Sequence, residues 1–183
     1  ARLQGFPDDL KFEGTLTSTQ LQVGNAVPVP LAKAVFEHLV QQAQSLGFEN
    51  RSLKAFSLFS GAGGMDIGAH LTRSIETKVA VDNWSDACAT LRCFFGKRIC
   101  VVEKDICTVE DPLSLWQNTS GEVEKPDIIF GGPPCQAFSQ AGKQKGLQDE
   151  RGGMIYEFLR FIKHLHPPFF VMENVSNLKG ISS

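Results

Sequence analysis

The chain has 183 residues, 42% of them apolar and 21% charged, which is enough for one well-packed domain and too little for two comfortable ones. The net charge of −2 carries no general signature of nucleic-acid binding, so a polyanion would need a local basic surface. No segment has the length of a membrane helix or the layout of a secretion signal, which predicts an intracellular protein without membrane contact, in the bacterial cytoplasm or, in a eukaryote, the nucleus.

The predicted elements begin with an N-terminal segment, residues 1–50, that differs from the rest. Its first part is irregular and rich in Gly, Pro and Asp, and "VPVPLAKAVFEHLVQQAQSLG" then predicts a helix from near Pro30 to Gly47. In the second segment, residues 51–183, apolar runs alternate with helical patterns. The predicted strands are 53–60, 78–82, 98–105, 126–132 and 168–174, and the predicted helices are 66–73, 85–95 and 153–165. This alternation indicates an α/β fold with a mostly parallel sheet and helices on both faces.

The cysteines give no sign of a metal site. Five cysteines without a CxxC pair, beside four scattered histidines, indicate neither zinc binding nor a disulfide framework, so we expect no metal. Cys135 stands apart, in "GGPPCQAF", at the end of an apolar strand. The others are expected to be reduced and buried in the core, namely Cys88, Cys93, Cys100 and Cys107.

A parallel sheet binds ligands beyond the carboxyl ends of its strands, and several candidate residues fall there. In "FSGAGGMDIG", the glycines Gly61, Gly63 and Gly64 would let backbone approach a ligand while helix-start amides face a polar or anionic group. Asp82 ends the second strand, where an acid accepts hydrogen bonds from ribose hydroxyls in nucleoside-binding folds. Asp105 ends the third strand and is a candidate acceptor for an adenine amino group, a surface-turn acid being the alternative.

Two further observations concern the identity of this ligand. Trp84 could pack on an adenine face, although a core tryptophan is the alternative. The turn lacks the full GxGxxG spacing of dinucleotide sites, which favours a single adenosine ligand.

Several segments together resemble a known family. "FSLFSGAGGMDIG", "GGPPCQAFSQAGKQKGLQDERG" and "FVMENV" resemble, in order and spacing, the cofactor loop, the Pro-Cys catalytic loop and the Glu-Asn-Val segment of DNA (cytosine-5) methyltransferases. "RLQGFPD" and "QVGNAVP" resemble that family's two last motifs, so the motif order resembles that of a circularly permuted member. The family's Arg-x-Arg segment and target-recognition domain are not recognisable.

The resemblance implies the Rossmann-like fold of S-adenosylmethionine-dependent methyltransferases. This chain would hold either the whole fold or an incomplete version of it. It also implies S-adenosyl-L-methionine as cofactor, S-adenosyl-L-homocysteine as product, and double-stranded DNA as substrate. Cys135 would attack carbon 6 of cytosine, which makes carbon 5 nucleophilic toward the methyl group. Glu173 would contact ring nitrogen 3 and the amino group, and Asn174 would brace the site. Arg151 would contact the base carbonyl or orient the loop, a solvated charge being the alternative.

The resemblance adds residues on both sides of the site. Asn25, in a "GNAVP" turn permitted by Gly24, would help to hold the methionine part of the cofactor, and a purely structural helix lead-in is the alternative. Phe59 would stack near the adenine or the sulfonium, unless it is a core residue. The loop with Gly142 and Gly146 as hinges would close over a flipped base, its DNA-binding candidates being Gln136, Ser139, Gln140, Lys143 and Lys145.

Target recognition requires more than this chain offers. Specific DNA interfaces bury about 1,000 Å² or more of protein surface, so we expect a second polypeptide or a further C-terminal segment to carry the recognition domain. Two other functions remain open: a tRNA cytosine-5 methyltransferase with DNA-type motifs, and a non-catalytic, cofactor-binding regulatory subunit.

Overall fold

A parallel sheet of five strands forms the centre of the protein. The computed structural model describes residues 1–49, 51–134 and 153–174. The strands are β1 (Leu53–Leu58), β2 (Ile75–Asp82), β3 (Cys100–Glu103), β4 (Ile128–Gly131) and β5 (Phe169–Met172). They lie in the order β3-β2-β1-β4-β5, all parallel, so the strand order reverses between β1 and β4. The sheet confirms the predicted α/β fold, which is that of Rossmann-like methyltransferases.

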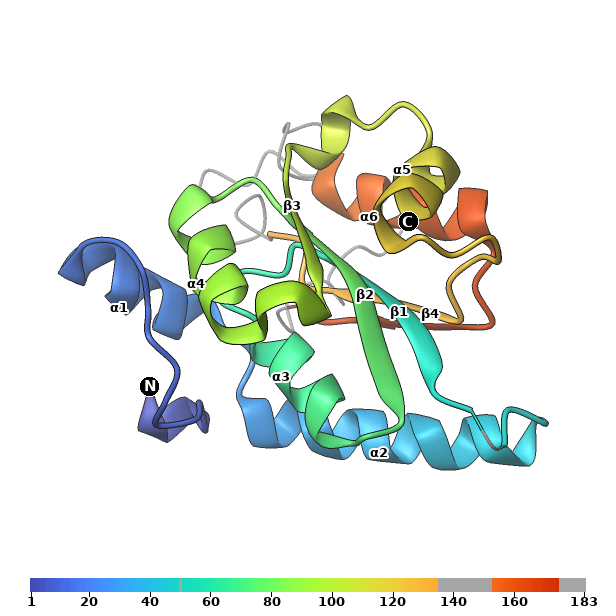
Figure 1. The fold of residues 1–183 in the computed structure, drawn as a ribbon, viewed down its shortest axis with the longest axis horizontal. Coiled ribbons are helices and arrows are strands. Elements are labelled where there is room, and N and C mark those ends of the chain that lie inside the picture. The colour runs from blue at the N-terminus through green and yellow to red at the C-terminus, as the bar shows by residue number, and fades with distance from the viewer. Residues whose placement is uncertain (50, 135–152, 175–183) are drawn as a thin grey trace, which may run out of the picture.

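Helices cover both faces of this sheet (Figure 1). One face carries α2 (Val29–Ser45), α3 (Gly64–Leu71) and α4 (Ser85–Phe95), and the other carries α5 (Pro112–Ser120) and α6 (Gly153–Leu165). The alternation of side chains along β2 explains the two faces: Val79 and Val81 pack with Trp116 and Phe158, whereas Ala80 packs on the opposite side. Among the described residues, no helix is long and apolar enough to span a membrane.

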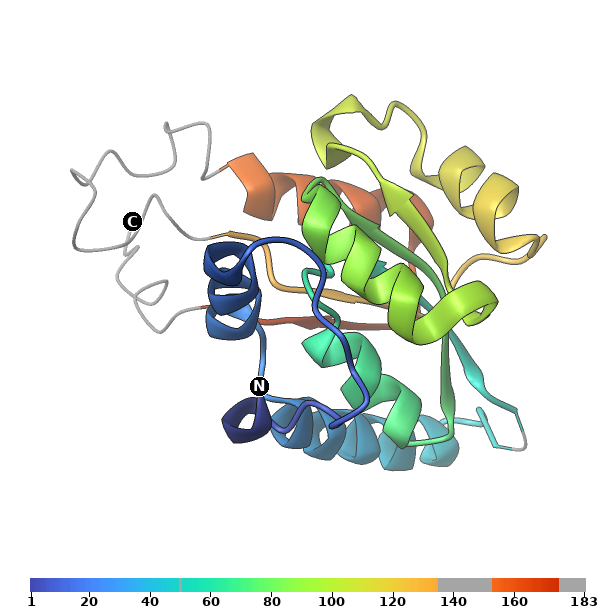
Figure 2. The same ribbon diagram turned by 60° about the vertical axis from the view of Figure 1, so that its left-hand side comes forward.

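The N-terminal segment contains a helix where the sequence predicts irregular chain. After a short 3-10 turn, η1 (Arg2–Gln4), the helix α1 (Leu16–Asn25) lies at the carboxyl end of the sheet (Figure 2). Its buried side chains are polar, Ser18 and Gln22, so it has no apolar periodicity to reveal it. Ser18 Oγ donates to Asp86 at 2.6 Å, and Gln22 accepts from Thr90 at 2.7 Å. These hydrogen bonds attach α1 to α4.

The second helix of this segment is built closely into the core. Phe36 is fully buried, and a Cβ atom added to Gly68 of α3 would lie 2.5 Å from the Cβ of Ala32. Small residues at this contact therefore let α2 and α3 approach closely. The helix begins at Val29 and ends at Ser45, near the predicted limits of Pro30 and Gly47.

The structure differs from the sequence prediction in three other places. β2 begins at Ile75 rather than residue 78, because the alternation of buried Ile75 and Thr77 with Glu76 starts there. Helix α5 was not predicted, although Asp111 caps its first turn by accepting from the Leu113 amide at 2.9 Å. The cysteine prediction was wrong for three residues: of the described cysteines only Cys88 is buried, because the others lie on outer helix, edge-strand or 3-10 turn positions, namely Cys93, Cys100 and Cys107.

Candidate functional site

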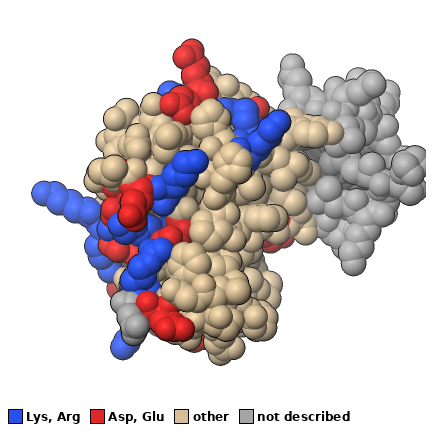
Figure 3. Space-filling model, turned by 90° about the vertical axis from the view of Figure 1, so that its right-hand side faces the viewer, with Lys and Arg blue, Asp and Glu red and all other residues tan. Residues whose placement is uncertain are grey.

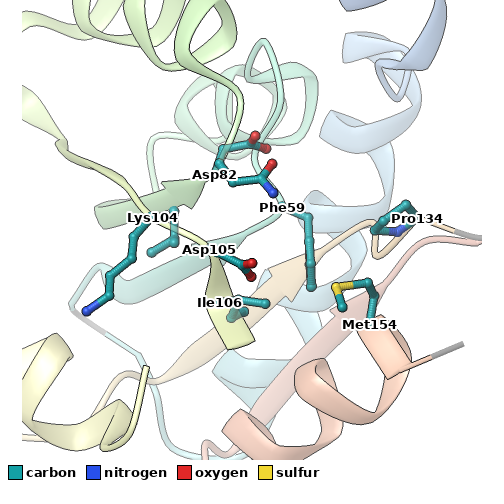
Figure 4. A pocket seen from close by; sticks show the side chains of 9 residues that line it. Phe59, Asp82, Lys104, Asp105, Ile106, Pro134 and Met154 are labelled. Atoms are coloured by element: carbon teal, nitrogen blue, oxygen red, sulfur yellow. The ribbon is translucent and has the colours of Figure 1, made fainter. Parts of the chain in front are cut away.

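A pocket lies at the carboxyl ends of the strands, as expected for this topology (Figure 4). It encloses about 340 Å³ of space, its open mouth included. The structure brings three of the predicted cofactor residues together here, Phe59, Asp82 and Asp105. The complete lining consists of Phe59, Val81, Asp82, Asn83, Lys104, Asp105, Ile106, Pro134 and Met154.

Phe59 is held in the pocket wall by an unusual backbone conformation. Its φ is +54°, a left-handed value that bulky side chains rarely adopt and that stores strain. The hydroxyls of Ser57 and Ser60, which flank it, lie 2.8 Å apart. The Ser60 amide also donates to the Val81 carbonyl at 3.2 Å. These contacts fix the end of β1 and the turn that follows it, residues 57–61.

Asp82 connects that turn to the end of β2. One carboxylate oxygen accepts from the Gly61 amide at 2.7 Å, and the other accepts from the Trp84 amide at 2.8 Å. Burial raises the pKa of Asp82, while these amide hydrogen bonds act in the opposite direction. Each carboxylate oxygen can accept a second hydrogen bond, so Asp82 can hold the protein loop and still receive a ligand hydroxyl.

The three glycines that follow Phe59 in the sequence have different surroundings. Gly61 has a φ of +52°, and a Cβ added there would meet nothing within 4 Å, so this position can face a ligand closely. A Cβ on Gly63 would lie 2.5 Å from Leu91, and one on Gly64 would lie 2.3 Å from the Val27 carbonyl oxygen. Gly63 and Gly64 therefore allow the loop to pack on α4 and on the N-terminal segment, a role that the sequence prediction of ligand approach did not include.

Asp105 reaches the pocket from the segment after β3. It is the cap of a 3-10 turn, η3 (Ile106–Thr108), rather than the last residue of a strand, and it accepts from the Cys107 amide at 2.9 Å. Its side chain points toward Phe59 across the pocket (Figure 4). A carboxylate in this place is available to an exocyclic amino group.

The proposed catalytic acid lies at the neighbouring strand ends. The Glu173 amide donates to the Gly131 carbonyl at 3.0 Å, and a Cβ on Gly132 would lie 3.1 Å from a Glu173 carboxylate oxygen. The side-chain amide of Asn174 donates to the Pro133 carbonyl at 3.2 Å. The segment after β5 is thus attached to the segment that leads into Cys135.

Several predicted residues fall outside the part of the chain that the structure describes. The catalytic candidates Cys135 and Arg151 lie outside the described residues, and so do the DNA-binding candidates Gln136, Ser139, Gln140, Lys143 and Lys145.

Two further predicted cofactor residues, in addition to the three glycines, are not part of the pocket lining. Trp84 is half-buried at the start of α4, where its amide binds Asp82. Asn25 is exposed at the last position of α1, and Gly24 lies inside that helix without a positive φ, so the predicted "GNAVP" turn begins later than expected.

Sequence reasoning also missed part of the lining. Asn83 follows Asp82, and Lys104 and Ile106 lie on either side of Asp105, so adjacency to the two predicted acids was the available signal. Met154 comes from the start of α6, far along the chain, and no local pattern marks it.

The charged side chains form no obvious DNA-binding surface on the face seen in Figure 3, where Lys and Arg are interspersed with Asp and Glu. Among the described residues, Arg51 forms a double hydrogen bond with Asp127, and Lys54 pairs with Glu122. The described residues also contain no group of three or more His, Cys, Asp or Glu that could hold a metal ion.

Comparison with known proteins identifies the family. The profile of C-5 cytosine-specific DNA methylases matches residues 1–41 and 53–182. The Type II methyltransferase M.AquIA of Picosynechococcus sp. is 44% identical over 125 residues, which are 68% of this chain and 49% of the relative. M1.ScrFI of Lactococcus lactis subsp. cremoris is 36% identical over 135 residues, 72% of this chain and 32% of the relative.

A third relative, M.HgiGI of Herpetosiphon aurantiacus, is 36% identical over 128 residues, 69% of this chain and 94% of the relative. The chain thus spans about half the length of M.AquIA and about a third of M1.ScrFI. Because the family profile covers nearly the whole sequence, this chain belongs to the C-5 cytosine-specific DNA methylase family.

Proposed function

We propose that the pocket binds S-adenosylmethionine and that the chain transfers its methyl group to carbon 5 of cytosine in double-stranded DNA. The observation that carries the proposal is the position of Pro134. This residue lines the same pocket as Phe59, Asp82 and Asp105, and Cys135 follows it directly in the sequence. A methyl donor in this pocket would therefore lie beside the proposed nucleophile.

The residues around the pocket fit an adenosine ligand. Phe59 offers an aromatic surface, Asp82 an acceptor for ribose hydroxyls, and Asp105 an acceptor for the adenine amino group. The open space beside Gly61 allows close approach of the ligand to the backbone. When bound, S-adenosylmethionine would supply an electrophilic methyl group and leave as S-adenosylhomocysteine.

The chain's own residues would activate the base. The Cys135 thiolate would form a bond to carbon 6 of a flipped cytosine, and its electron pair would make carbon 5 able to take the methyl group. Loss of the proton from carbon 5 and departure of the thiolate would then restore the ring. Glu173 would contact ring nitrogen 3 and the amino group, and Arg151 the base carbonyl or the loop. Asn174 would hold the Cys135 segment through its bond to Pro133.

We also propose that the motif order is circularly permuted, with residues 1–50 supplying the family's last motifs. The family profile matches residues 1–41 and 53–182 as two separate blocks, so the N-terminal segment belongs to the family match as well. The close packing of α2 on α3 and the hydrogen bond between α1 and α4 attach this segment to the rest of the domain.

Target recognition is assigned to a second polypeptide or a further C-terminal segment. On the face seen in Figure 3, Lys and Arg are interspersed with Asp and Glu, and among the described residues Arg51 and Lys54 pair with carboxylates, so these side chains give little basis for binding a duplex. We therefore expect the 183-residue chain to show little sequence-specific methylation until the recognition part is added.

A covalent trap tests the chemistry. DNA containing 5-fluorocytosine carries fluorine where a proton must leave, so an adduct with Cys135 should accumulate when cofactor and the recognition part are present. Mass spectrometry should place the adduct on Cys135, and Cys135→Ser should form none while binding cofactor within about tenfold of wild type. An adduct on another cysteine would overturn the assignment.

Two other functions can be separated from this one with radiolabelled cofactor. A tRNA methyltransferase would label tRNA and leave DNA unlabelled. A regulatory subunit would bind cofactor and label neither nucleic acid, even with the recognition part present.

A further inference from the structure

The segment that carries Asp105 into the pocket is short and lies at the edge of the sheet. Asp105 caps the 3-10 turn η3, and Ile106 is the first residue of that turn. The segment follows β3, an edge strand in which no residue is buried. The hydrogen bonds of Asp105 with Cys107 and Thr108 shape the turn, but they do not place it relative to the rest of the pocket. A fixed position for Asp105 therefore requires a contact from outside this segment.

Arg160 of α6 supplies such a contact. Its Nη2 group donates to the Ile106 carbonyl at 3.2 Å. Among the described residues, this is the one hydrogen bond that joins η3 to a distant part of the chain, 54 residues away. The same carbonyl accepts from the Val109 amide at 3.2 Å, so both of its lone pairs are used.

Glu157, one turn earlier in α6, fixes the direction of the Arg160 guanidinium. A single Glu157 carboxylate oxygen accepts from Nε at 2.8 Å and from Nη2 at 2.6 Å. Nη2 carries two hydrogens, and it has two acceptors, Glu157 and the Ile106 carbonyl. The side chains of the ion pair are 33% and 23% exposed, so the pair is partly shielded from water. The orientation of Arg160 toward η3 is thus set by its own helix.

Helix α6 is a firm support for this bond. Phe158 and Phe161 are fully buried, which holds the helix against the sheet. The start of the same helix carries Met154, which lines the pocket together with Asp105 (Figure 4). Arg160 therefore fastens the Asp105 segment to a helix that is itself part of the pocket wall.

We propose that Arg160 is a positioning residue for recognition of the base: its bond to Ile106 holds the Asp105 carboxylate where the amino group of adenine can donate to it. Asp105 accepts from the Cys107 amide through one oxygen, and its carboxylate has acceptor capacity left for a ligand. Without Arg160 the turn can shift, and a displaced carboxylate no longer forms a short, well-aligned hydrogen bond.

The effect should fall on the base and not on the ribose. Asp82, the proposed ribose acceptor, is held by the Gly61 and Trp84 amides, which do not depend on Arg160. This inference rests on the proposed function for the identity of the ligand.

Two ligands separate recognition of the base from a general weakening of the site. S-adenosylhomocysteine has the amino group, and its purine analogue carries hydrogen in that place. Calorimetry should show that wild type prefers S-adenosylhomocysteine by at least about tenfold, the scale of a hydrogen bond to a charged group. Arg160→Met keeps an apolar stem but has no donor, and it should reduce this preference to about twofold. Its affinity for the purine analogue should stay within about twofold of wild type.

A double substitution tests whether Arg160 acts through Asp105. Asp105→Ala should also remove the preference. Adding Arg160→Met to Asp105→Ala should weaken binding no further, because no carboxylate is left to position. Additive effects of the two substitutions would overturn the proposal, and so would equal weakening of both ligands by Arg160→Met or an unchanged preference.

Arg98→Met is the matched control. Arg160 lies over the ring of Phe161, and Arg98 lies in the same way over the ring of Phe95. Arg98 also donates to backbone carbonyls, but it precedes β3 and so lies at the end of that strand away from Asp105. This variant should keep the wild-type preference for S-adenosylhomocysteine. Loss of the preference in Arg98→Met would contradict a specific role of Arg160.

Amide exchange without ligand separates this inference from the proposed function. Arg160→Met should speed exchange of the Val109 amide, which donates to the same carbonyl, while exchange in β1 stays as in wild type. Unchanged Val109 exchange would refute the attachment of η3 by Arg160. Faster Val109 exchange in the variant, with no binding of either ligand to wild type, would instead refute the proposed function. Equal binding of both ligands to wild type would refute Asp105 as the base acceptor, and this inference with it.

Discussion

The Asp82 carboxylate accepts a hydrogen bond from the Gly61 amide at 2.7 Å, so the acid at the end of β2 holds the turn that follows β1. The same side chain also accepts from Trp84 at the start of α4. Two walls of the pocket therefore depend on one carboxylate. A ligand hydroxyl bound to Asp82 would be positioned by the same group that shapes the loop around it.

Replacement of Asp82 should weaken cofactor binding. Asp82→Ala removes the proposed ribose acceptor and both loop hydrogen bonds, and loss of bonds to a charged group costs roughly 1.5–3 kcal/mol. Calorimetry should therefore show at least about tenfold weaker binding. Asp9→Ala, which removes an exposed acid elsewhere, should leave the affinity unchanged. Wild-type affinity in a folded Asp82→Ala chain would refute this part of the site.

Asp66 should make the protein less stable as pH rises. The unfolded carboxyl loses its proton near pH 4, whereas burial raises the pKa of the folded one to about 7, so folding takes up a proton between these values. The stability contributed by the neutral acid is complete below pH 4 and is lost as pH rises through 7. At about 1.4 kcal/mol per pH unit, the loss by pH 8 could reach about 4 kcal/mol.

Urea unfolding of wild type and Asp66→Asn across this pH range measures the effect. The wild-type free energy of unfolding should fall relative to that of Asp66→Asn between pH 4 and pH 7, and the difference should be constant above it. Parallel curves over the whole range would contradict a raised pKa at this site.

Gly64→Ala should disturb the contact between the cofactor loop and the N-terminal segment. The new methyl group would lie 2.3 Å from the Val27 carbonyl oxygen, so the backbone must shift. Overpacking of this kind typically costs about 1–3 kcal/mol, which urea unfolding would detect. Gly24→Ala is the control: nothing lies within 4 Å of its new Cβ, and alanine in α1 should stabilise by about 0.5–1 kcal/mol. Equal effects of the two substitutions would contradict the packing argument.

Asn174→Ala should slow the chemistry more than it weakens cofactor binding. The Asn174 amide donates to the Pro133 carbonyl, and the lost bond is worth about 1 kcal/mol, or several-fold in rate, if it positions the Cys135 segment. With the recognition part present, the adduct on 5-fluorocytosine DNA should form several-fold more slowly, while calorimetry shows nearly wild-type cofactor affinity. A normal adduct rate would mean that this bond does not position the nucleophile.

The sequence alone determined the α/β architecture and much of the candidate pocket. Apolar strand runs and helical spacing are local patterns, and the parallel sheet follows from their alternation. Because parallel strands end at one edge, the sequence places Asp82 and Asp105 together, and the family resemblance adds Phe59 to them. The order of the motifs likewise led to the family that the profile comparison established.

The tertiary structure decided the features that depend on residues distant in the chain. Helix α1 escaped prediction because its buried face is polar and finds its partners on α4. The absence of a side chain at Gly64 is explained by the Val27 carbonyl oxygen, which lies where a Cβ would be. Met154 lines the pocket from a helix about 70 residues beyond Asp82 in the sequence. The burial of Asp66 also results from packing: its sequence position suggests an ordinary helix-start acid, and only the surrounding core removes it from water and leaves its carboxyl oxygens without a hydrogen bond among the described residues.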